Sequence, residues 1–217
     1  MRPGKAASGS RSPGVRGLGR LHVLVDSVSL AEAALEGGAP TLQVRVKLGS
    51  DRRRFETVAA IAERCRNADV TCIVDDRADF AVAAGADGVH VGAEDLSVAA
   101  ARRVVGPDLF VGATARDSQT ARSLVAAGAD YLGVGPAYPT TSKVDLPAPL
   151  GVEGVAAVAS AVPVPVIAIA GITAARVPEM LSAGVWGVAV IGAVSHADDP
   201  REATHELVTV LTREVVP

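Results

Sequence analysis

The sequence predicts an α/β fold, a single (β/α)8 TIM barrel over residues 21–217 that follows a disordered basic tail over residues 1–20. Short apolar runs alternate with amphipathic stretches along the chain, which is typical of parallel strands joined by helical crossovers. Eight such units in roughly 195 residues match the length of a small barrel. Hydrophobic residues make up 49% of the chain but aromatic residues only 3%. The core must therefore consist mainly of Val, Ala, Leu and Ile, which suits parallel strands covered by helices.

Eight apolar runs are the expected strands, because short runs bounded by Gly, Pro or Asp are typical of buried strands. In chain order they are LHVLVD (21–26), TLQVRVK (41–47), VTCIVD (70–75), DGVHVG (87–92), LFVGAT (109–114), YLGVGP (131–136), VPVIAIAG (164–171) and WGVAVIG (186–192). An imperfect repeat supports them, as in AAGADGVHV and AAGADYLGV, where a helical stretch ends in glycine before an apolar strand. Glycine is favoured there because many helices end in a left-handed residue.

The stretches between these strands place apolar residues near positions i, i+3, i+4 and i+7, which indicates helices with one buried face. The clearest are residues 29–39, 53–68, 117–129, 175–185 and 200–215. Asp198 or Asp199 is the expected N-cap of the last helix. A doubly wound open sheet is the alternative arrangement. The barrel is favoured because no GxGxxG motif follows the first strand.

Charge is spread unevenly along the chain. The net charge is −3, yet residues 1–20 carry five cations and no acid, so the remainder is distinctly acidic. An acidic body argues against nucleic acid as a main partner. The tail has no apolar core that would make it a signal peptide, and no segment has the run of about 18 apolar residues that indicates a membrane span. We therefore expect neither nucleic acid nor a membrane among the partners.

The cysteines and histidines carry little functional signal. Cys65 and Cys72 lie seven residues apart, without a CxxC pattern or a nearby ligand cluster. They are predicted to be ordinary thiols of a cytoplasmic protein. His90 is expected to be a hydrogen-bonded residue within the barrel, and the other three histidines to lie at the surface or at a strand start.

The candidate site comes from the strand ends, because catalytic groups of such barrels lie at the C-terminal ends of the strands. The second strand ends in QVRVK. Side-chain alternation places Gln43, Arg45 and Lys47 on one face of it and the two valines on the other. The polar three then point toward the mouth, where two cations would attract an anionic substrate.

The third and fourth strands each end near a pair of acids. Asp75 and Asp76 close the third run, and Glu94 and Asp95 follow the fourth. Carboxylates that converge on a cleft suit a hard cation with oxygen ligands, and Mg²⁺ is the expected one. We expect Asp76 and Asp95 to hold it and Glu94 to face solvent. The alternative is that Asp75 or Asp76 only caps the following helix.

Two further regions suit phosphate groups. The sixth strand runs into the long loop VGPAYPTTSK, which contains Thr140, Ser142 and Lys143. Hydroxyls and an ammonium group bind phosphate oxygens, and loops of this length are often lids. The seventh and eighth strands end in AIAGI and AVIGAV, where glycine lets backbone N–H groups approach an anion. Two anion sites around a metal indicate a transferase that joins phosphorylated fragments.

These motifs resemble those of the thiamine phosphate synthase family. The resemblance runs from residue 21 to about residue 210 and rests chiefly on VDDRADFAVAAGADGVHVGAEDL and YLGVGPAYPTTSKVDLPAPLG, with QVRVK and AIAGI in support. It implies a (β/α)8 barrel enzyme of thiamine biosynthesis. With Mg²⁺, such an enzyme couples hydroxymethylpyrimidine diphosphate to a thiazole phosphate and releases pyrophosphate.

The resemblance also implies roles for individual residues. The metal ligands would be Asp76 and Asp95. Arg45, Lys47 and Lys143 would act catalytically on the departing pyrophosphate. No protein nucleophile is required. The residues that would bind the two substrates are Gln43, Arg45, Lys47, Asp75, Thr114, Thr140, Ser142, Lys143, Gly171, Ile191 and Gly192.

The chain departs from the family pattern at several positions. Asp75 stands where the family has asparagine, which removes an amide donor and adds charge beside the metal site. Val46 replaces a glutamate, but strand alternation turns this side chain away from the mouth. Ala115 and Arg116 replace a polar stretch, and Ala170 replaces a glycine. These changes indicate a divergent member of the family.

Two alternatives stay open from the sequence. A thiazole tautomerase with a similar barrel would not need PTTSK, Arg45 or Lys47. A ligand-binding paralogue without catalytic activity would fit Asp75, Ala115 and Arg116. Both a monomer and a homo-oligomer also remain open, and the exact thiazole phosphate is not identified.

Overall fold

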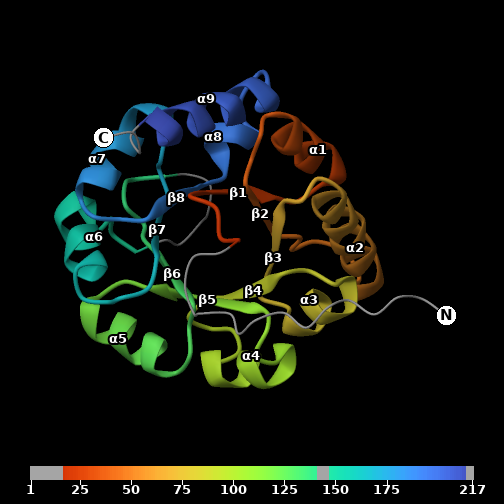
Figure 1. Ribbon diagram of the computed structural model, residues 1–217, viewed down its shortest axis with the longest axis horizontal. Helices are drawn as coiled ribbons and strands as arrows, with labels where there is room; N and C mark the ends of the chain where they lie inside the picture. Colours follow the sequence, from red (N-terminus) through yellow and green to blue (C-terminus); the bar gives the residue numbers. More distant parts are fainter. Residues whose placement is uncertain (1–16, 141–146, 214–217) are drawn as a thin grey trace, which may run out of the picture.

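The predicted barrel is confirmed. In the computed structural model, which describes residues 17–140 and 147–213, eight parallel strands close into a barrel in the order β1 to β8 with helices around it (Figure 1). The strands are β1 Leu21–Val25, β2 Thr41–Val44, β3 Thr71–Asp75, β4 Gly88–Val91, β5 Phe110–Ala115, β6 Tyr131–Val134, β7 Val166–Ile169 and β8 Gly187–Val190. Several of them end earlier than predicted, so Arg45 and Lys47 follow β2 instead of closing it.

The helices fill the intervals between the strands. They are α1 Val28–Glu36, α2 Asp51–Asn67, α3 Ala78–Ala84, α4 Val98–Val105, α5 Ser118–Ala126, α6 Gly151–Ala159, α7 Val177–Ser182, α8 Gly192–Ser195 and α9 Pro200–Arg213, with a 3-10 turn η1 Ala174–Arg176. Asp199 accepts hydrogen bonds from the N–H groups of Arg201 and Glu202, at 3.0 and 3.1 Å, and so caps the start of α9. The short helix α8 was not predicted from the sequence.

Side chains alternate between two apolar regions, as the period of a strand requires. In β1, Leu21, Val23 and Val25 face the layer between barrel and helices. Leu24 instead belongs to a smaller cluster with Tyr131, which the alternation places inside the barrel. Cys65 and Cys72 are buried in the outer layer as free thiols, as predicted.

Large and small residues fit together inside the barrel. Gly112 of β5 is paired with Tyr131 of β6, and a Cβ atom on Gly112 would lie 2.1 Å from the tyrosine ring. Gly88 is paired with Phe110, whose Cβ would be 2.7 Å away from an added Cβ. Tyr131 and Phe110 thus occupy space that glycines on the neighbouring strand leave open.

The N-terminal end of the barrel is closed by residues that the sequence analysis placed in the tail. Leu18 is buried and packs in the interior cluster. The Arg20 guanidinium donates from Nε to the carbonyl oxygen of Trp186 over 2.7 Å. The packed part of the chain therefore begins at least as early as residue 17, four residues before the predicted boundary. Within the part that the structure describes, no helix is long and apolar enough to cross a membrane.

Candidate active site

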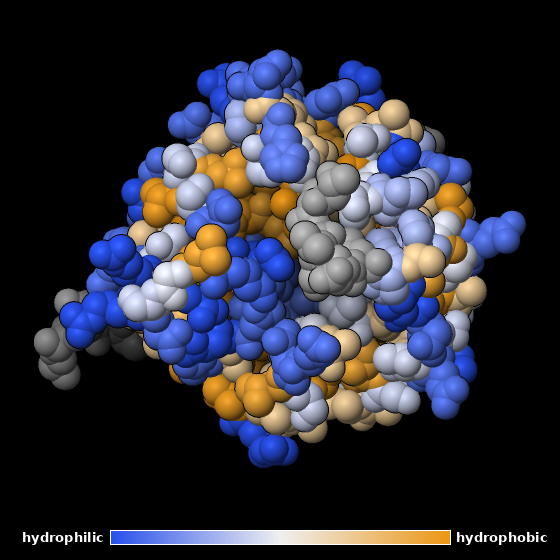
Figure 2. All heavy atoms as spheres, turned by 180° about the vertical axis from the view of Figure 1, so that it is seen from behind, coloured by the Kyte–Doolittle hydropathy of each residue, from blue (hydrophilic) through white to orange (hydrophobic). Residues whose placement is uncertain are grey.

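Figure 2 shows hydrophilic side chains on one side of the middle of the molecule and an apolar area on another. The C-terminal ends of the parallel strands meet at one end of the barrel. Two cations there lie against two acids. Nε of Arg45 is 3.3 Å from Oδ2 of Asp75, and Nζ of Lys47 is 3.7 Å from the same oxygen. Lys47 also pairs with Asp76, and Gln43 donates from Nε2 to Oδ1 of Asp75 over 2.8 Å. The polar residues predicted at the ends of β2 and β3 therefore form a single cluster, which we call the mouth cluster.

The backbone fixes Asp76 within this cluster. Its φ is +64°, a left-handed conformation that aspartate tolerates better than most residues. Its N–H donates to the carbonyl oxygen of His90 over 2.8 Å, which ties the end of β3 to β4. The N-cap position of α3 belongs to Arg77. The alternative that Asp75 or Asp76 only caps this helix is therefore wrong.

The two adjacent acids differ in their affinity for a proton. Burial, together with the charge of Asp76, raises the pKa of Asp75 to about 6, although Gln43 and the cations oppose this rise. Burial also disfavours the charged form of Asp76. Hydrogen bonds with Lys47 and Asp95 outweigh that effect and lower the pKa of Asp76. Asp76 is therefore the more acidic of the pair.

Asp95 meets Asp76 from the neighbouring strand end. Its Oδ2 accepts the N–H of Gly92 over 2.8 Å, which closes a short turn after β4. Burial and a hydrogen bond shared with Asp76 raise the pKa of Asp95. The neighbouring Glu94 is exposed, as predicted. Two carboxyl groups that lie close enough to shift each other's pKa can offer two oxygen ligands to a hard divalent cation.

Asp76 and Asp95 form a two-carboxylate candidate for a cation site. No group of three or more His, Cys, Asp or Glu side chains in the described residues is arranged to hold a metal ion. Mg²⁺ suits so few ligands, because it usually keeps several waters and binds through one or two carboxylates together with substrate phosphates. The residues present therefore fit a magnesium ion that arrives with a phosphorylated substrate.

Thr114 lies at the top of a polar column inside the barrel. Its hydroxyl is 3.0 Å from Nε2 of His90, and Nδ1 of the same ring is 3.1 Å from the hydroxyl of Tyr131. Burial lowers the pKa of His90 to about 4, so the ring is neutral near pH 7. The prediction of a hydrogen-bonded barrel histidine is confirmed. His22 was expected at the surface or at a strand start. It is the second residue of β1, and it is fully buried.

The ends of β7 and β8 lie side by side on the opposite part of the mouth, since these strands pair along the barrel. Gly171 has φ +68° directly after β7. Ile191 directly follows β8, and Gly192 is the first residue of α8. Thr140 lies at the start of the loop after β6, whereas Ser142 and Lys143 lie outside the described residues. The structure thus places the candidate thiazole-phosphate residues on adjacent strand ends.

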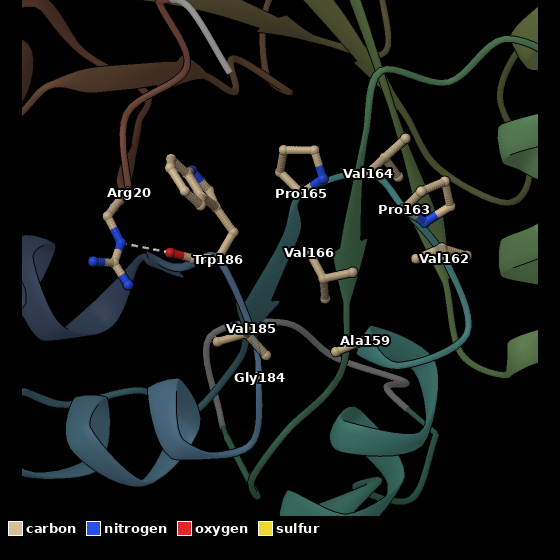
Figure 3. A pocket seen from close by; sticks show the side chains of 10 residues that line it. All are labelled: Arg20, Ala159, Val162, Pro163, Val164, Pro165, Val166, Gly184, Val185 and Trp186. Carbon is tan, nitrogen blue, oxygen red and sulfur yellow. Dashed lines mark hydrogen bonds between the residues drawn. The ribbon is translucent and has the colours of Figure 1, made fainter. Parts of the chain in front are cut away.

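A cavity of about 310 Å³ opens at the other end of the barrel and is shown in Figure 3. Its lining is mostly apolar, and Arg20 stacks over the ring of Trp186 at 5.4 Å. The lining residues precede β1, β7 and β8 and so lie at the N-terminal ends of the strands, where barrel enzymes keep residues for stability. This cavity is not part of the candidate site.

Sequence reasoning missed several contacts that shape the mouth. Arg116 donates from Nη2 to the carbonyl oxygen of Ala148 over 2.7 Å, which joins the end of β5 to the loop before α6. Tyr138 donates from its hydroxyl to Glu179 over 2.5 Å. The only signal for Arg116 was its departure from the family pattern. Nothing in the sequence pairs Tyr138 with a residue 41 positions away.

The fold and the mouth cluster define the class of protein. A (β/α)8 barrel that gathers cations and carboxylates at the ends of adjacent strands is a barrel enzyme for phosphorylated substrates. The chain belongs to the thiamine monophosphate synthase family, whose model matches residues 21–194.

Relatives over nearly the whole chain agree with this. A thiamine-phosphate synthase of Salinispora tropica is 50% identical over 204 residues, which cover 90% of this chain and 98% of the relative. A thiamine-phosphate synthase of Salinibacter ruber is 41% identical over 207 residues, which cover 92% of this chain and 91% of the relative. The solved structure of a thiamine phosphate pyrophosphorylase from Pyrococcus furiosus superposes with a TM-score of 0.84 at 36% identity. It covers 91% of this chain and 97% of its own.

Proposed function

We propose that this chain is a thiamine phosphate synthase. It transfers the pyrimidinylmethyl group of hydroxymethylpyrimidine diphosphate to the nitrogen of a thiazole phosphate and releases pyrophosphate. The observation that carries the proposal is the mouth cluster, in which Arg45 and Lys47 meet Asp75 and Asp76 at the ends of adjacent strands. The family to which the chain belongs supports it.

The proposed reaction needs charge stabilisation and positioning. The C–O bond between the pyrimidine methylene and the diphosphate breaks, and its electron pair leaves with pyrophosphate. The ring stabilises the resulting methylene cation, and the thiazole nitrogen donates its lone pair to form the new C–N bond. Arg45 and Lys47 would exchange their carboxylate partners for diphosphate oxygens. Fixed cations act strongly on a leaving group because they need no reorganisation during the reaction.

Magnesium is part of the proposal. Asp76 and Asp95 would hold Mg²⁺, which would neutralise charge on the diphosphate. Lys47 pairs with Asp76, so the binding of metal and substrate together would release this lysine toward the diphosphate. Lys143, predicted from the sequence, would add a second ammonium group, and its replacement by alanine is expected to lower turnover about a hundredfold or more.

Positioning of the two rings would come from groups that surround the mouth cluster. Gln43 is held by Asp75, so that the amide is orientated before substrate arrives. Thr114 is held by the neutral His90. Such preorganisation lowers the entropic cost of bringing the methylene cation and the thiazole nitrogen together.

A coupling assay tests the proposal. The purified chain is supplied with pyrimidine diphosphate, thiazole phosphate and Mg²⁺, and thiamine phosphate and pyrophosphate are quantified. We expect equal amounts of the two products, loss of both in a chelator, and recovery when Mg²⁺ is restored. Assays with the carboxylated and the simple thiazole phosphate identify the substrate. Binding without product would favour the non-catalytic paralogue, and isomerisation of the thiazole alone would favour the tautomerase. A cytoplasmic location stays a prediction.

A further inference from the structure

The turn after β7 has an unusual backbone. Ala170 has φ +77° and Gly171 has φ +68°, so two consecutive residues are left-handed. Only glycine adopts this conformation without steric cost. A Cβ atom on Gly171 would lie 2.7 Å from Cβ of Tyr138 and 2.8 Å from the carbonyl oxygen of Pro139. The turn is therefore pressed against the start of the loop that follows β6.

The carbonyl oxygens of this turn accept hydrogen bonds from residues outside it. The N–H of Tyr138 donates to the oxygen of Ala170 over 3.1 Å. Nη1 of Arg176 donates to the oxygen of Gly171 over 2.5 Å. In a planar trans peptide the N–H points opposite to the C=O, so the N–H groups of Gly171 and Ile172 point away from Tyr138 and Arg176. Within the described residues, neither N–H donates a hydrogen bond. Successive free N–H groups in a turn of this kind suit an anion.

Three side chains hold this arrangement together. The guanidinium of Arg176 lies 4.3 Å from the centroid of the Tyr138 ring, within the range of a cation–π contact. The tyrosine hydroxyl donates to Oε2 of Glu179 over 2.5 Å. Burial and this carboxylate raise the pKa of Tyr138 to about 12, so the hydroxyl stays protonated and keeps donating. Arg176 is thereby stacked on one side and bonded to the turn on the other.

We propose that Arg176, supported by Tyr138 and Glu179, is a positioning residue that orientates the N–H groups of Gly171 and Ile172 toward the phosphate of the thiazole substrate. Arg176 acts through the peptide of Gly171 and does not itself touch the substrate. The proposal rests on the proposed function, because it takes the turn after β7 as the thiazole-phosphate site. It adds that the support comes from the start of the β6 loop and from the turn η1.

The test measures the two substrates separately. Steady-state rates of Arg176→Ala are recorded with each substrate varied against a saturating amount of the other. We expect the KM for thiazole phosphate to rise about tenfold or more, the loss typical of one broken charged hydrogen bond. The KM for pyrimidine diphosphate stays within about twofold. Arg176→Lys, which keeps a donor, recovers part of the loss.

The matched control is Arg102, which also donates to loop carbonyl oxygens, those of Gly106 and Leu109, but at the N-terminal end of the barrel. Arg102→Ala lowers stability and leaves both KM values unchanged. If Arg176→Ala does not fold, Tyr138→Phe serves, since it removes only the bond to Glu179. It is expected to raise the same KM by about threefold.

Calorimetric titration of thiazole phosphate into the parent and Arg176→Ala separates this inference from the proposed function. If the parent binds thiazole phosphate more tightly than the variant but makes no thiamine phosphate, the proposed function fails and the positioning role stands. Equal binding by the two proteins, or equal changes of both KM values in an active enzyme, overturns the positioning role.

Discussion

Asp75 stands at a position where the resemblance to the family leads us to expect asparagine. Its carboxylate is about one-tenth exposed, accepts a hydrogen bond from Gln43 and forms ion pairs with Arg45 and Lys47. A carboxylate can only accept hydrogen bonds, so it binds the Nε2 of Gln43 and leaves the amide oxygen of that residue for other donors. The aspartate thus organises the same groups that the proposed mechanism requires.

The pH dependence of stability tests the environment of Asp75. Its pKa of about 6 in the folded protein lies above the value of 3.8 that is normal for aspartate. The folded state therefore binds this proton more tightly than the unfolded state. The stability that this group contributes is present at low pH and is lost as the pH rises from about 4 to about 6, by at most about 3 kcal/mol.

Asp75→Asn removes this titration. We expect the free energy of unfolding of the variant, relative to the parent, to increase between pH 4 and pH 7. Urea denaturation of both proteins at the two pH values measures the change. Asp117→Asn is the control, since Asp117 is an exposed helix cap and lacks the raised pKa. An unchanged difference between Asp75→Asn and the parent would contradict the assigned environment.

Ala170 supplies a second prediction at the residue scale. A left-handed alanine costs about 1–2 kcal/mol, while glycine in its place loses about 0.5–1 kcal/mol through the flexibility of the unfolded chain. Ala170→Gly is therefore expected to stabilise the protein by up to about 1 kcal/mol in denaturant unfolding. Ala127→Gly, at a helix end with φ −78°, should not stabilise. Destabilisation by Ala170→Gly would show that its backbone is not strained.

At the scale of the elements, the strand ends are where sequence reasoning worked and where it stopped. The apolar runs located each strand, and the fold class then placed Arg45, Lys47, Asp75 and Asp76 on one face. Local patterns could not give the contacts between them, because partners such as Gln43 and Asp75 come from different strands. The shortened β2 shows the same limit, since the run of alternating residues continues past the last ladder pair.

The packing of side chains inside the barrel also could not be predicted from the sequence. The register of β5 on β6 decides that Tyr131 covers Gly112, and the sequence pattern contains no register. His22 does lie at the start of β1, one of the two positions predicted for it, but its complete burial was not predicted.

The fit between β5 and β6 predicts a severe effect of one methyl group. Gly112→Ala would bring Cβ to 2.1 Å from the Tyr131 ring, so the strands must separate or the ring must leave its rotamer. Such overpacking costs about 1–3 kcal/mol or more. Thermal unfolding of Gly112→Ala measures it, and Gly112→Ala with Tyr131→Phe is a useful second variant, because it removes the hydroxyl that lies 2.5 Å from the added atom. Full stability of the single variant would contradict the observed register.

At the scale of the whole molecule, the two ends of the barrel differ, because one is closed by packed side chains and the other carries the candidate site. The N-terminal end is closed by Leu18 and by the stacked pair of Arg20 and Trp186. The C-terminal end carries the mouth cluster and the turn after β7. This division follows from parallel strands, whose C-terminal ends all open on the same face. It explains how an acidic chain with a net charge of −3 can present cations where an anionic substrate would bind.

In the proposed function the mouth cluster promotes the departure of pyrophosphate, and the rate of pyrophosphate release by Asp76→Ala tests this role. The rate is measured at saturating substrates and Mg²⁺ beside the parent and beside Glu94→Ala, which changes an exposed acid next to the proposed metal ligand Asp95. We predict that Asp76→Ala is slower than the parent by about a hundredfold or more, the scale of losing one preorganised electrostatic group, and that Glu94→Ala matches the parent. Near-parental release by Asp76→Ala would contradict a role of the mouth cluster in the reaction.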